Sequence, residues 1–335
     1  MRVLYFFCVL NVVSSYIFPN LLPFYYKIGE VDELKDEPKK IIIDDEKLCL
    51  FKDQKTGVIK LISDKCPHRS ASLSKKGVLD SNGGIVCMYH GICFHKHYNT
   101  GLTSNLRIIN NDIFFCPTKI PADDVFYPPE EFDKNFRIIS GKVKLNTNIN
   151  IFLENVLDSQ HVYYVHLFGK DAGNVSNLEH KRLSNTHYRQ TYDITTGPYS
   201  LSNQIQKMKK EKPLLNIQNE YSMPSNVLSR VKIDKNSTKT VFVRAYPISN
   251  NETMIYWYIY RDFMVYEAEL FNLIGDWIFR VLFLYTLSED IGILNHVYNV
   301  DELEKSKQIH IKYDKIQIEY RRDCKKFINL KNLDN

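Results

Sequence analysis

Two pairs of cysteine and histidine lie close together in the segment CPHRSASLSKKGVLDSNGGIVCMYHG, residues 66–91. The first pair is Cys66 and His68, and the second pair is Cys87 and His90. Thiolate ligands suit soft metals and imidazole suits zinc or iron, so the two pairs can hold one metal centre between them. A zinc site, an iron–sulfur cluster and a purely structural role are all open from the residue types alone.

The order of the ligands within each pair favours an iron–sulfur cluster. Zinc fingers usually group Cys with Cys and His with His, whereas each pair here carries one of each. A two-iron cluster can place both thiolates on one iron and both imidazoles on the other, and these neutral ligands raise its reduction potential. We expect Gly83–Gly84 and Gly91 to let the backbone approach the cluster sulfurs. We expect Ser70 and Tyr89 to donate hydrogen bonds that tune the potential.

This stretch resembles the Rieske family closely. The segments CPHRSASLS and GGIVCMYHG follow the family's Cys-Pro-His-Arg…Cys-x-Tyr-His-Gly pattern nearly position by position. Ile92 is a departure, because the family often has Trp after the Gly, and Cys93 lies outside the pattern as an expected buried Cys. The resemblance implies a [2Fe–2S] Rieske cluster held by Cys66, His68, Cys87 and His90.

A second set of metal-ligating residues follows in ENVLDSQHVYYVH, residues 154–166, which contains His161 and His166. A spacing of five is not ideal on a straight helix. We therefore expect a distorted turn, or a helix that ends between them, to bring both imidazoles to one metal. With a carboxylate they would form the two-histidine, one-carboxylate set of non-haem Fe(II) oxygenases. Taken alone, two histidines near aromatic residues are more often part of an ordinary core.

The second segment is similar to the Rieske oxygenase pattern Asn-x-x-Asp-x-x-His-x-x-x-x-His, read here as Asn155, Asp158, His161 and His166. In that family Asp158 would sit between a cluster histidine of one subunit and an iron ligand. It would accept hydrogen bonds from both and act as the electron-transfer bridge. The alternative is a carboxylate on a helix surface.

The third iron ligand implied by this resemblance is a carboxylate far along the chain. The segment LSEDIGILNH, residues 287–296, resembles the family segment that follows a long helix. We predict Asp290 as the ligand, with Glu289 as the alternative that neither spacing nor composition excludes. The implied second cofactor is a mononuclear Fe(II) held by His161, His166 and Asp290.

The elements that must position these residues fall into two parts. Short β runs and Gly-containing turns up to about residue 117 predict a small all-β domain, with hairpins around DQKTG (53–57) and Asn110–Asn111. Residues 121–136, rich in Pro and acids, are interpreted as a linker. Alternating runs in 185–260 predict antiparallel strands, and 264–286 and 301–326 predict helices. We expect an α+β fold class, and the resemblance implies a Rieske domain at 23–120 and a helix-grip-like catalytic domain with an antiparallel sheet at 136–330.

The composition of the chain gives no sign of a nucleic-acid partner or of a disulfide framework. The 335 residues are 44% hydrophobic and 25% charged, which is ordinary for a globular chain, and the net charge of +5 is too small to indicate nucleic acid. Seven Cys, an odd number at low density, argue against a disulfide framework and favour reduced thiols as metal ligands.

The N-terminal residues 1–22 have the layout of a secretory signal or a short membrane anchor. Arg2 precedes an apolar run from Val3 to Val13, and Ser14–Ser15 follow. The alternative is a buried N-terminal strand or helix. An oxidising secretory lumen is a poor place for free thiolate ligands. A signal-like start therefore favours membrane anchoring or the first half of a plastid address.

Within the family the chain looks most like the pheophorbide a oxygenase branch, on FLENVLDSQHVYYVH and on CPTKIPADDVFYPPEEFD. This resemblance implies a ferredoxin or a reductase as electron donor, a plastid membrane, and a bulky, flat hydrophobic substrate such as a chlorophyll-related tetrapyrrole. It also implies a homotrimer that passes electrons between neighbouring subunits. No pyridine-nucleotide or flavin motif is evident, so the donor is expected to be a separate protein.

Two departures separate the chain from that branch. The branch's C-terminal Cys-x-x-Cys is missing, with only Cys324 in that region, and paired C-terminal membrane helices are not evident. The apolar stretch Phe271–Tyr285 is interrupted by Asp276 and Arg280. A sterol-desaturase-like Rieske oxygenase and a non-catalytic Rieske electron-transfer protein are the alternative functions.

Overall fold

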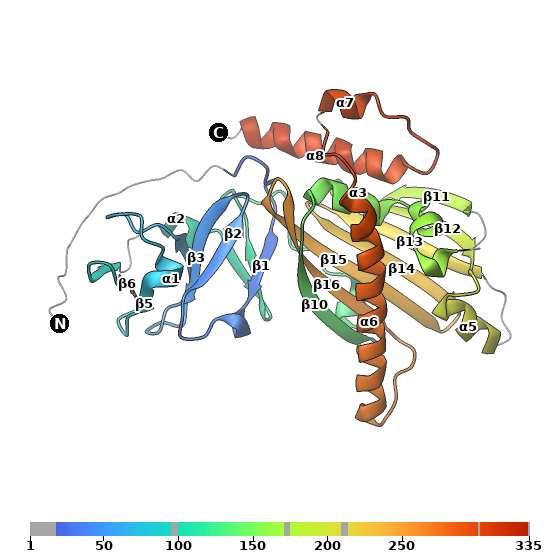
Figure 1. Ribbon diagram of the computed structural model, residues 1–335, viewed down its shortest axis with the longest axis horizontal. Coiled ribbons are helices and arrows are strands. Elements are labelled where there is room, and N and C mark those ends of the chain that lie inside the picture. The colour runs from blue at the N-terminus through green and yellow to red at the C-terminus, as the bar shows by residue number, and fades with distance from the viewer. Residues whose placement is uncertain (1–17, 95–99, 171–174, 209–213, 301, 334–335) are drawn as a thin grey trace. The chain divides into compact units, whose positions relative to one another are not determined.

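The chain forms two compact units in the computed structural model, which describes residues 18–94, 100–170, 175–208, 214–300 and 302–333 (Figure 1). One unit comprises Met1–Asp124 with Tyr246–Asn250, and the other comprises Val125–Ala245 with Asn251–Asn335. Most of the signal-like stretch, residues 1–17, lies outside the described residues. Its last part is buried in the first unit, where the rings of Phe18 and Phe115 meet edge to face at 5.2 Å.

The first unit is built from three small antiparallel sheets, as the short β runs predict. Their strand orders are β1-β9-β8, β2-β3-β4 and β5-β6-β7. The strands are β1 (Tyr26–Glu30), β2 (Lys39–Ile43), β3 (Glu46–Lys52), β4 (Ile59–Ser63), β5 (Gly77–Leu79), β6 (Ile85–Cys87), β7 (Ile92–Phe94), β8 (Leu106–Ile109) and β9 (Asp112–Phe115). Short helices are η1 (Val31–Glu33), α1 (Leu73–Lys76) and α2 (Thr100–Thr103).

Both predicted hairpins of this unit are confirmed. In the β3–β4 turn the Asp53 carboxylate accepts the backbone amides of Lys55 and Thr56 at 2.9 and 3.0 Å, and Gly57 takes a φ of +74°. In the β8–β9 turn Asn110 takes a φ of +54°, a conformation that Asn tolerates better than most residues. Side-chain acceptors and left-handed residues therefore fix where each chain reversal occurs.

The second unit contains a seven-stranded sheet in the order β10-β16-β15-β14-β13-β12-β11. The strands are β10 (Arg137–Leu145), β11 (Ser176–Arg182), β12 (His187–Thr195), β13 (Leu214–Ser222), β14 (Asn226–Asp234), β15 (Ser237–Ser249) and β16 (Glu252–Arg261). The helices are η2 (Pro129–Phe132), α3 (Ile149–Leu157), α4 (His161–Val165), η3 (Leu167–Gly169), α5 (Leu201–Met208), α6 (Glu269–Leu294), α7 (Glu302–Ser306) and α8 (Lys315–Leu333).

The segment interpreted as a linker joins the second unit from residue 125 onward. Within it η2 carries Glu130, which is buried against the sheet. The Arg230 guanidinium donates to this carboxylate at 3.0 Å, and the Thr240 hydroxyl donates at 2.8 Å. A buried carboxylate needs such partners, because desolvation without them strongly disfavours its charge. Glu130 is thus fixed to the sheet rather than solvated.

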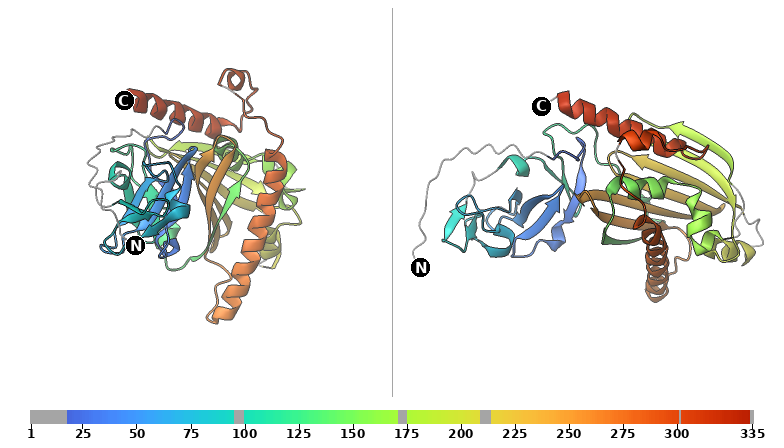
Figure 2. Two further views of the ribbon diagram at one scale, coloured as in Figure 1. Left: turned by 60° about the vertical axis from the view of Figure 1, so that its left-hand side comes forward. Right: turned by 45° about the horizontal axis from the view of Figure 1, so that its top comes forward.

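Helix α6 runs across one face of the seven-stranded sheet and can be followed in orange and brown in two views (Figure 2). Its buried residues are separated by three, four or eight positions, which places them on one helix face; they are Asn272, Gly275, Phe279, Leu287, Asp290 and Leu294. Gly275 leaves room for the Arg261 guanidinium, which would lie 3.1 Å from a Cβ, and Asp276 binds that guanidinium at 2.8 Å.

The outward side of α6 is apolar and exposed. By length and composition this helix could cross a membrane, and only 22% of its apolar window is buried, while no second such helix occurs among the described residues. Asp276 and Arg280, which interrupt the stretch in sequence, both turn toward the sheet. Asp276 binds Arg137 at 2.7 Å, and Arg280 donates to the Ser140 carbonyl at 2.9 Å.

Candidate metal centres

Two closed turns present the first ligand set. The Cys66 loop follows β4, and the Cys66 carbonyl accepts the amide of Ser70 at 2.7 Å. The Cys87 loop joins β6 to β7, and the Cys87 carbonyl accepts the amide of Gly91 at 2.9 Å. Ser70 and Gly91 both have a left-handed φ, +56° and +68°. The two loops therefore share one closing geometry, with the histidine carried inside each turn.

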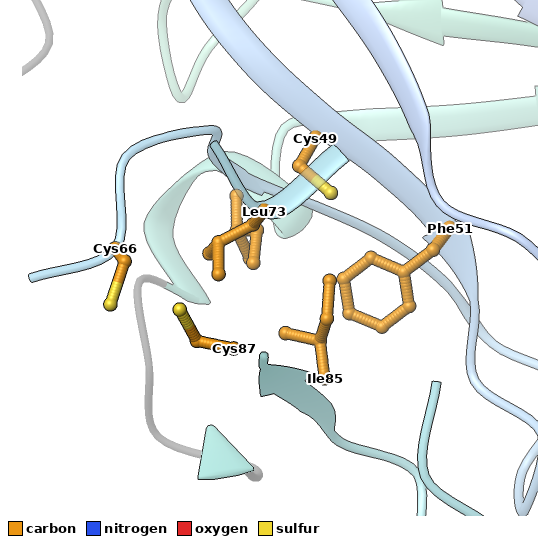
Figure 3. Packing of buried hydrophobic residues seen from close by; sticks show 7 residues of the cluster. Cys49, Phe51, Cys66, Leu73, Ile85 and Cys87 are labelled. Carbon is orange, nitrogen blue, oxygen red and sulfur yellow. The ribbon is translucent and has the colours of Figure 1, made fainter. Parts of the chain in front are cut away.

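The four predicted cluster ligands lie close together, with the two imidazoles exposed and the two thiols buried. The Nδ1 atoms of His68 and His90 lie 3.2 Å apart, and both imidazoles are exposed. Cys66 and Cys87 are buried, at 3% and 1% exposure, in a cluster with Leu73 and Ile85. Figure 3 shows the two sulfur atoms side by side at the edge of that cluster. Two nitrogens thus face outward and two thiols face inward.

This donor set fits a two-iron cluster. Burial raises the pKa of the Cys66 thiol, although the backbone amides of His68 and Arg69 act in the opposite direction. Two adjacent thiolates at a buried position therefore require a strongly positive partner, which ferric iron supplies. Both cysteines are free thiols rather than a disulfide. The split into an inner sulfur pair and an outer imidazole pair is the ligand division of a Rieske cluster.

The surroundings of these loops correct part of the sequence interpretation. Gly83 has a φ of +87°, and a Cβ there would clash with the Asp53 carboxylate. Its small size therefore serves packing between two hairpins. Tyr89 contacts the His90 ring at a centroid distance of 4.0 Å. Cys93 is half-buried beside Asp80 at 3.8 Å, and burial and this carboxylate raise its pKa to about 11.

The second ligand set is placed by a short helix that begins at His161 and ends just before His166. Helix α3 stops at Leu157, with Asp158 as its extended C-cap residue. Helix α4 starts at His161 and runs only to Val165, and His166 is its C-cap residue with a ψ of 134°. The prediction that a helix ending would compensate for the spacing of five is therefore confirmed.

Three donor atoms converge at this point. The Nε2 atoms of His161 and His166 lie 3.2 Å apart, and each lies 3.4 Å from Oδ1 of Asp290 on α6. The ligand atoms of this His161–His166–Asp290 triad all lie within 4.8 Å of one another. Two neutral imidazoles and one carboxylate are the donor set of mononuclear non-haem iron, so the residues present fit that metal.

The two acidic candidates for the third ligand have different positions. Asp290 faces both imidazoles, and its Oδ1 also accepts the side-chain amide of Asn155 at 2.9 Å. Glu289 instead accepts from the other nitrogen of His166, Nδ1, at 3.0 Å and from the backbone amide of Leu167 at 3.2 Å. Glu289 is therefore placed to orient His166, while Asp290 is placed to complete a metal-binding set with the two histidines.

Asp158 supports His161 through its backbone. The His161 Nδ1 lies 2.8 Å from the Asp158 carbonyl oxygen, whereas the Asp158 carboxylate accepts the amide of Gln160 at 2.7 Å. The expected side-chain bond to the iron ligand is thus replaced here by a main-chain bond. Burial acts to lower the pKa of His161, but Asp290 and Asp158 raise it overall; burial lowers the pKa of His166.

Phe168 is a site residue that sequence reasoning missed. Its ring stacks on His166 at a centroid distance of 4.9 Å and an angle of 13°. A single Phe after a histidine carries no recognisable signal in a sequence with nineteen Phe. Asn155 and Glu289 could be found in the sequence, because Asn155 is the first residue of the metal-binding pattern and Glu289 precedes Asp290. Their contacts could not be predicted from spacing.

A cluster-binding β domain followed by a sheet-and-helix domain with a two-histidine, one-carboxylate site defines a two-centre Rieske protein. The Rieske [2Fe-2S] domain model matches residues 24–107, and the model of the vanillate O-demethylase oxygenase C-terminal domain matches residues 145–330. The chain therefore belongs to the Rieske oxygenase family, and its cofactor domains are those predicted from the two motifs.

Named relatives span both bacterial and plastid proteins. The chain is 29% identical over 160 residues to the oxygenase component of dicamba O-demethylase from Stenotrophomonas maltophilia, covering 42% of this chain and 46% of that one. It is 23% identical over 340 residues to protochlorophyllide-dependent translocon component 52, chloroplastic, from Arabidopsis thaliana, covering 84% and 59%. The chain thus spans about half the length of these relatives. A 71-residue stretch is 35% identical to rice pheophorbide a oxygenase, chloroplastic, covering 21% and 13%.

Solved structures agree on the fold. Dicamba monooxygenase bound to dicamba superposes with a TM-score of 0.68 at 18% identity, covering 95% of this chain and 99% of that one. Pseudomonas putida CBB5 NdmA with caffeine superposes with a TM-score of 0.66 at 18% identity, covering 90% and 89%. The predicted α+β fold, a small β domain followed by an antiparallel sheet with helices, is confirmed.

Proposed function

We propose that this chain is a Rieske non-haem iron oxygenase that uses dioxygen and electrons from a ferredoxin or reductase to oxidise a bulky hydrophobic substrate. The observation that carries this proposal is the convergence of His161, His166 and Asp290, whose donor atoms lie within 4.8 Å of one another. An electron-transfer protein has no need of this second donor set. Matches to oxygenases over both parts of the chain support the same reaction class.

The chain's own residues prepare the second centre in three ways. His161 and His166 present Nε2 because the Asp158 carbonyl and the Glu289 carboxylate occupy their Nδ1 atoms. Asp290 supplies the negative charge, and the stacked Phe168 ring shields one side of His166 from water. When bound, the cluster supplies single electrons and the iron supplies the redox chemistry that activates dioxygen.

Oxygen uptake tests the proposal directly. The loaded protein is reduced anaerobically, mixed with oxygen, and assayed with pheophorbide a, a sterol, dicamba, caffeine and a flavone, with mass detection of the product. We expect oxygen uptake coupled to an oxidised product for one of these compounds, either a hydroxylated product or a demethylated product with release of formaldehyde. Two irons per chain, with no change in metal content in His161→Ala, would instead establish the electron-transfer alternative. Conversion of the sterol alone would overturn the tetrapyrrole as substrate class.

The tetrapyrrole substrate and the plastid location rest on the chloroplastic relatives. The aromatic side chains of the second unit that could offer a flat wall to such a substrate mostly serve the core. Trp257 packs on Phe283 at 4.6 Å, the Tyr260 hydroxyl donates to Glu131 at 2.6 Å, and Tyr164 is exposed. The homotrimer stays a prediction from the resemblance, to be checked by the mass of the purified protein in solution.

Membrane association is proposed through the outward face of α6. Leu270, Ile274, Trp277, Val281 and Leu284 on this face are all exposed. We expect the chain to float with vesicles of digalactosyldiacylglycerol and phosphatidylglycerol, because each large apolar side chain gains about 1.5–3 kcal/mol when removed from water.

The double change Leu270→Gln and Trp277→Gln is expected to reduce the floating fraction by roughly tenfold or more. Ile309→Gln is the control, since Ile309 is even more exposed than Leu270 and Trp277 but lies outside α6. Wild-type protein that stays in solution, or equal flotation of the double variant, would show that α6 does not contact lipid.

A further inference from the structure

A row of four polar side chains crosses neighbouring strands of the large sheet. Residue pairing places His180 of β11 opposite Gln190 of β12, Gln190 opposite Asn219 of β13, and Asn219 opposite Ser229 of β14. Side chains at paired positions of adjacent strands project from the same face of a sheet. His180, Gln190, Asn219 and Ser229 are called the polar row.

The polar row lies on the face covered by helices. Tyr192, two residues from Gln190 on the same strand and therefore on the same face, packs in a hydrophobic cluster that Tyr163 of α4 joins. Burial, the Tyr163 hydroxyl and the Asp158 carboxylate all raise the pKa of Tyr192. The Tyr192 hydroxyl accepts from the Asn219 amide at 3.3 Å. The row thus adjoins the segment that carries the iron ligand His161.

At the Ser229 end of the polar row the side chains hydrogen-bond to one another, and at the His180 end they do not. The Ser229 hydroxyl donates to Oδ1 of Asn219 at 2.9 Å. Gln190 is completely buried, at 0% exposure, and neither its Oε1 nor its Nε2 has a hydrogen-bond partner among the described residues. Within the same described set, Nδ1 of His180 and the Tyr163 hydroxyl also have none. An unpaired buried polar group costs about 1–3 kcal/mol, so a core position would favour an apolar residue.

The chain shows what a structural buried glutamine looks like. Gln206 of α5 is 1% exposed, and its Nε2 donates to the carbonyls of Leu214 and Ile233, both at 2.8 Å. Its Oε1 accepts from the Thr196 hydroxyl at 3.3 Å. The Gln206 side chain links α5 to β13 and β14 by hydrogen bonds. The side chain of the similarly buried Gln190 makes no hydrogen bond among the described residues. Gln190 is therefore the fully buried residue of the polar row whose whole carboxamide remains available for hydrogen bonding on the helix-covered face.

We propose that Gln190 is a specificity-determining residue that recognises a substrate carrying a neighbouring hydrogen-bond donor and acceptor. A carboxamide offers one acceptor and two donors, so its complement is a lactam, an amide or a comparable pair on a flat, mostly apolar skeleton. His180, its cross-strand neighbour, can serve a further polar atom. This inference rests on the proposed oxygenase function, because it assigns the substrate side of that site.

A buried hydrogen-bonding site discriminates strongly between ligands that carry the complementary polar group and ligands that lack it. A pocket built to bind a polar group rejects an analogue that lacks it, because the buried protein group then stays unpaired. A suitable pair of probes is 2-quinolone, a flat lactam with an N–H and a C=O, and N-methyl-2-quinolone, in which the donor is blocked. The loaded protein is expected to bind 2-quinolone roughly tenfold more tightly or better, measured by equilibrium dialysis.

Gln190→Met tests the residue, because Met has similar length and no comparable donor or acceptor. We expect the preference between the two quinolones to disappear, and the thermal midpoint of the variant to equal or exceed that of the wild type. Gln206→Met is the matched control and is expected to melt lower while it keeps the preference. Equal binding of both probes by the wild type, or a preference that persists in Gln190→Met, would overturn the proposal.

A structural role for Gln190 gives a different result. If buried water alone satisfies its carboxamide, Gln190→Met melts as low as Gln206→Met, and the inference is wrong. Neither the binding assay nor the melting assay needs turnover. A chain that binds 2-quinolone selectively through Gln190 but consumes no oxygen would remove the proposed reaction while leaving the recognition site in place.

Discussion

Replacing Asp290 with Ala is expected to empty the second metal centre and leave the cluster intact. Iron content should fall to the two irons of the cluster, and substrate-dependent oxygen uptake should fall by at least about a hundredfold. Oδ1 of Asp290 lies 3.4 Å from Nε2 of both His161 and His166, and no other carboxylate of the described residues does so. Without it, two neutral imidazoles must hold a divalent cation with no compensating negative charge. Metal analysis and oxygen-electrode traces on the same preparation measure both effects.

Glu289→Gln is the matched control, since it removes a neighbouring carboxylate from the same helix turn. His166 then loses its charged Nδ1 partner but keeps Asp290 opposite Nε2. We expect iron affinity to fall by about 10–100-fold, so that excess Fe(II) restores a full site and much of the activity. The opposite pattern, with Glu289→Gln permanently empty and Asp290→Ala still loaded, would exchange the two roles.

The distinction between these two acids shows where sequence reasoning stops. The sequence segment after the long apolar helix predicted that the third iron ligand is the carboxylate of residue 290 or residue 289. Adjacent helical residues point about 100° apart, so either one can face the histidines according to how the helix is rotated. That rotation is set by the stripe of buried residues from Asn272 to Leu294 packing on the sheet, which depends on tertiary contacts. The pairing of Asn155 with Asp290 is another contact of this kind.

Local chemistry was more predictable than long-range packing. The two hairpins and the break of α4 at His166 follow from turn residues and from the spacing of the histidines. The role of Gly83 did not, because its neighbour Asp53 lies on a hairpin thirty positions earlier. Gln190 is similar, since its position beside His180 and Asn219 arises from strand register across the sheet. Register is fixed jointly by several strands, and one strand's sequence does not contain it.

Removal of one inner thiol of the first centre should abolish the whole cluster. In Cys87→Ala we expect complete loss of the visible absorption and of the reduced-state electron paramagnetic resonance signal, together with loss of reduction by the external donor. We expect both iron atoms to be released, because the Cys66 and Cys87 loops would hold them jointly, with their histidine nitrogens only 3.2 Å apart. The unit should also lose stability, because metal binding contributes directly to folding free energy.

Two other thiols of the same unit serve as controls. Cys93 pairs across the sheet with Val86, one residue from Cys87, yet it lies beside Asp80. Cys49 is buried in the same hydrophobic cluster as Cys66 and Cys87, and burial raises its pKa strongly (Figure 3). Cys93→Ala and Cys49→Ala are therefore expected to keep the absorption spectrum. A colourless Cys93→Ala or Cys49→Ala beside a coloured Cys87→Ala would mean that the ligands were assigned to the wrong sulfurs. Zinc in place of iron in the wild type would mean that the alternation of Cys and His within each pair does not select a two-iron cluster.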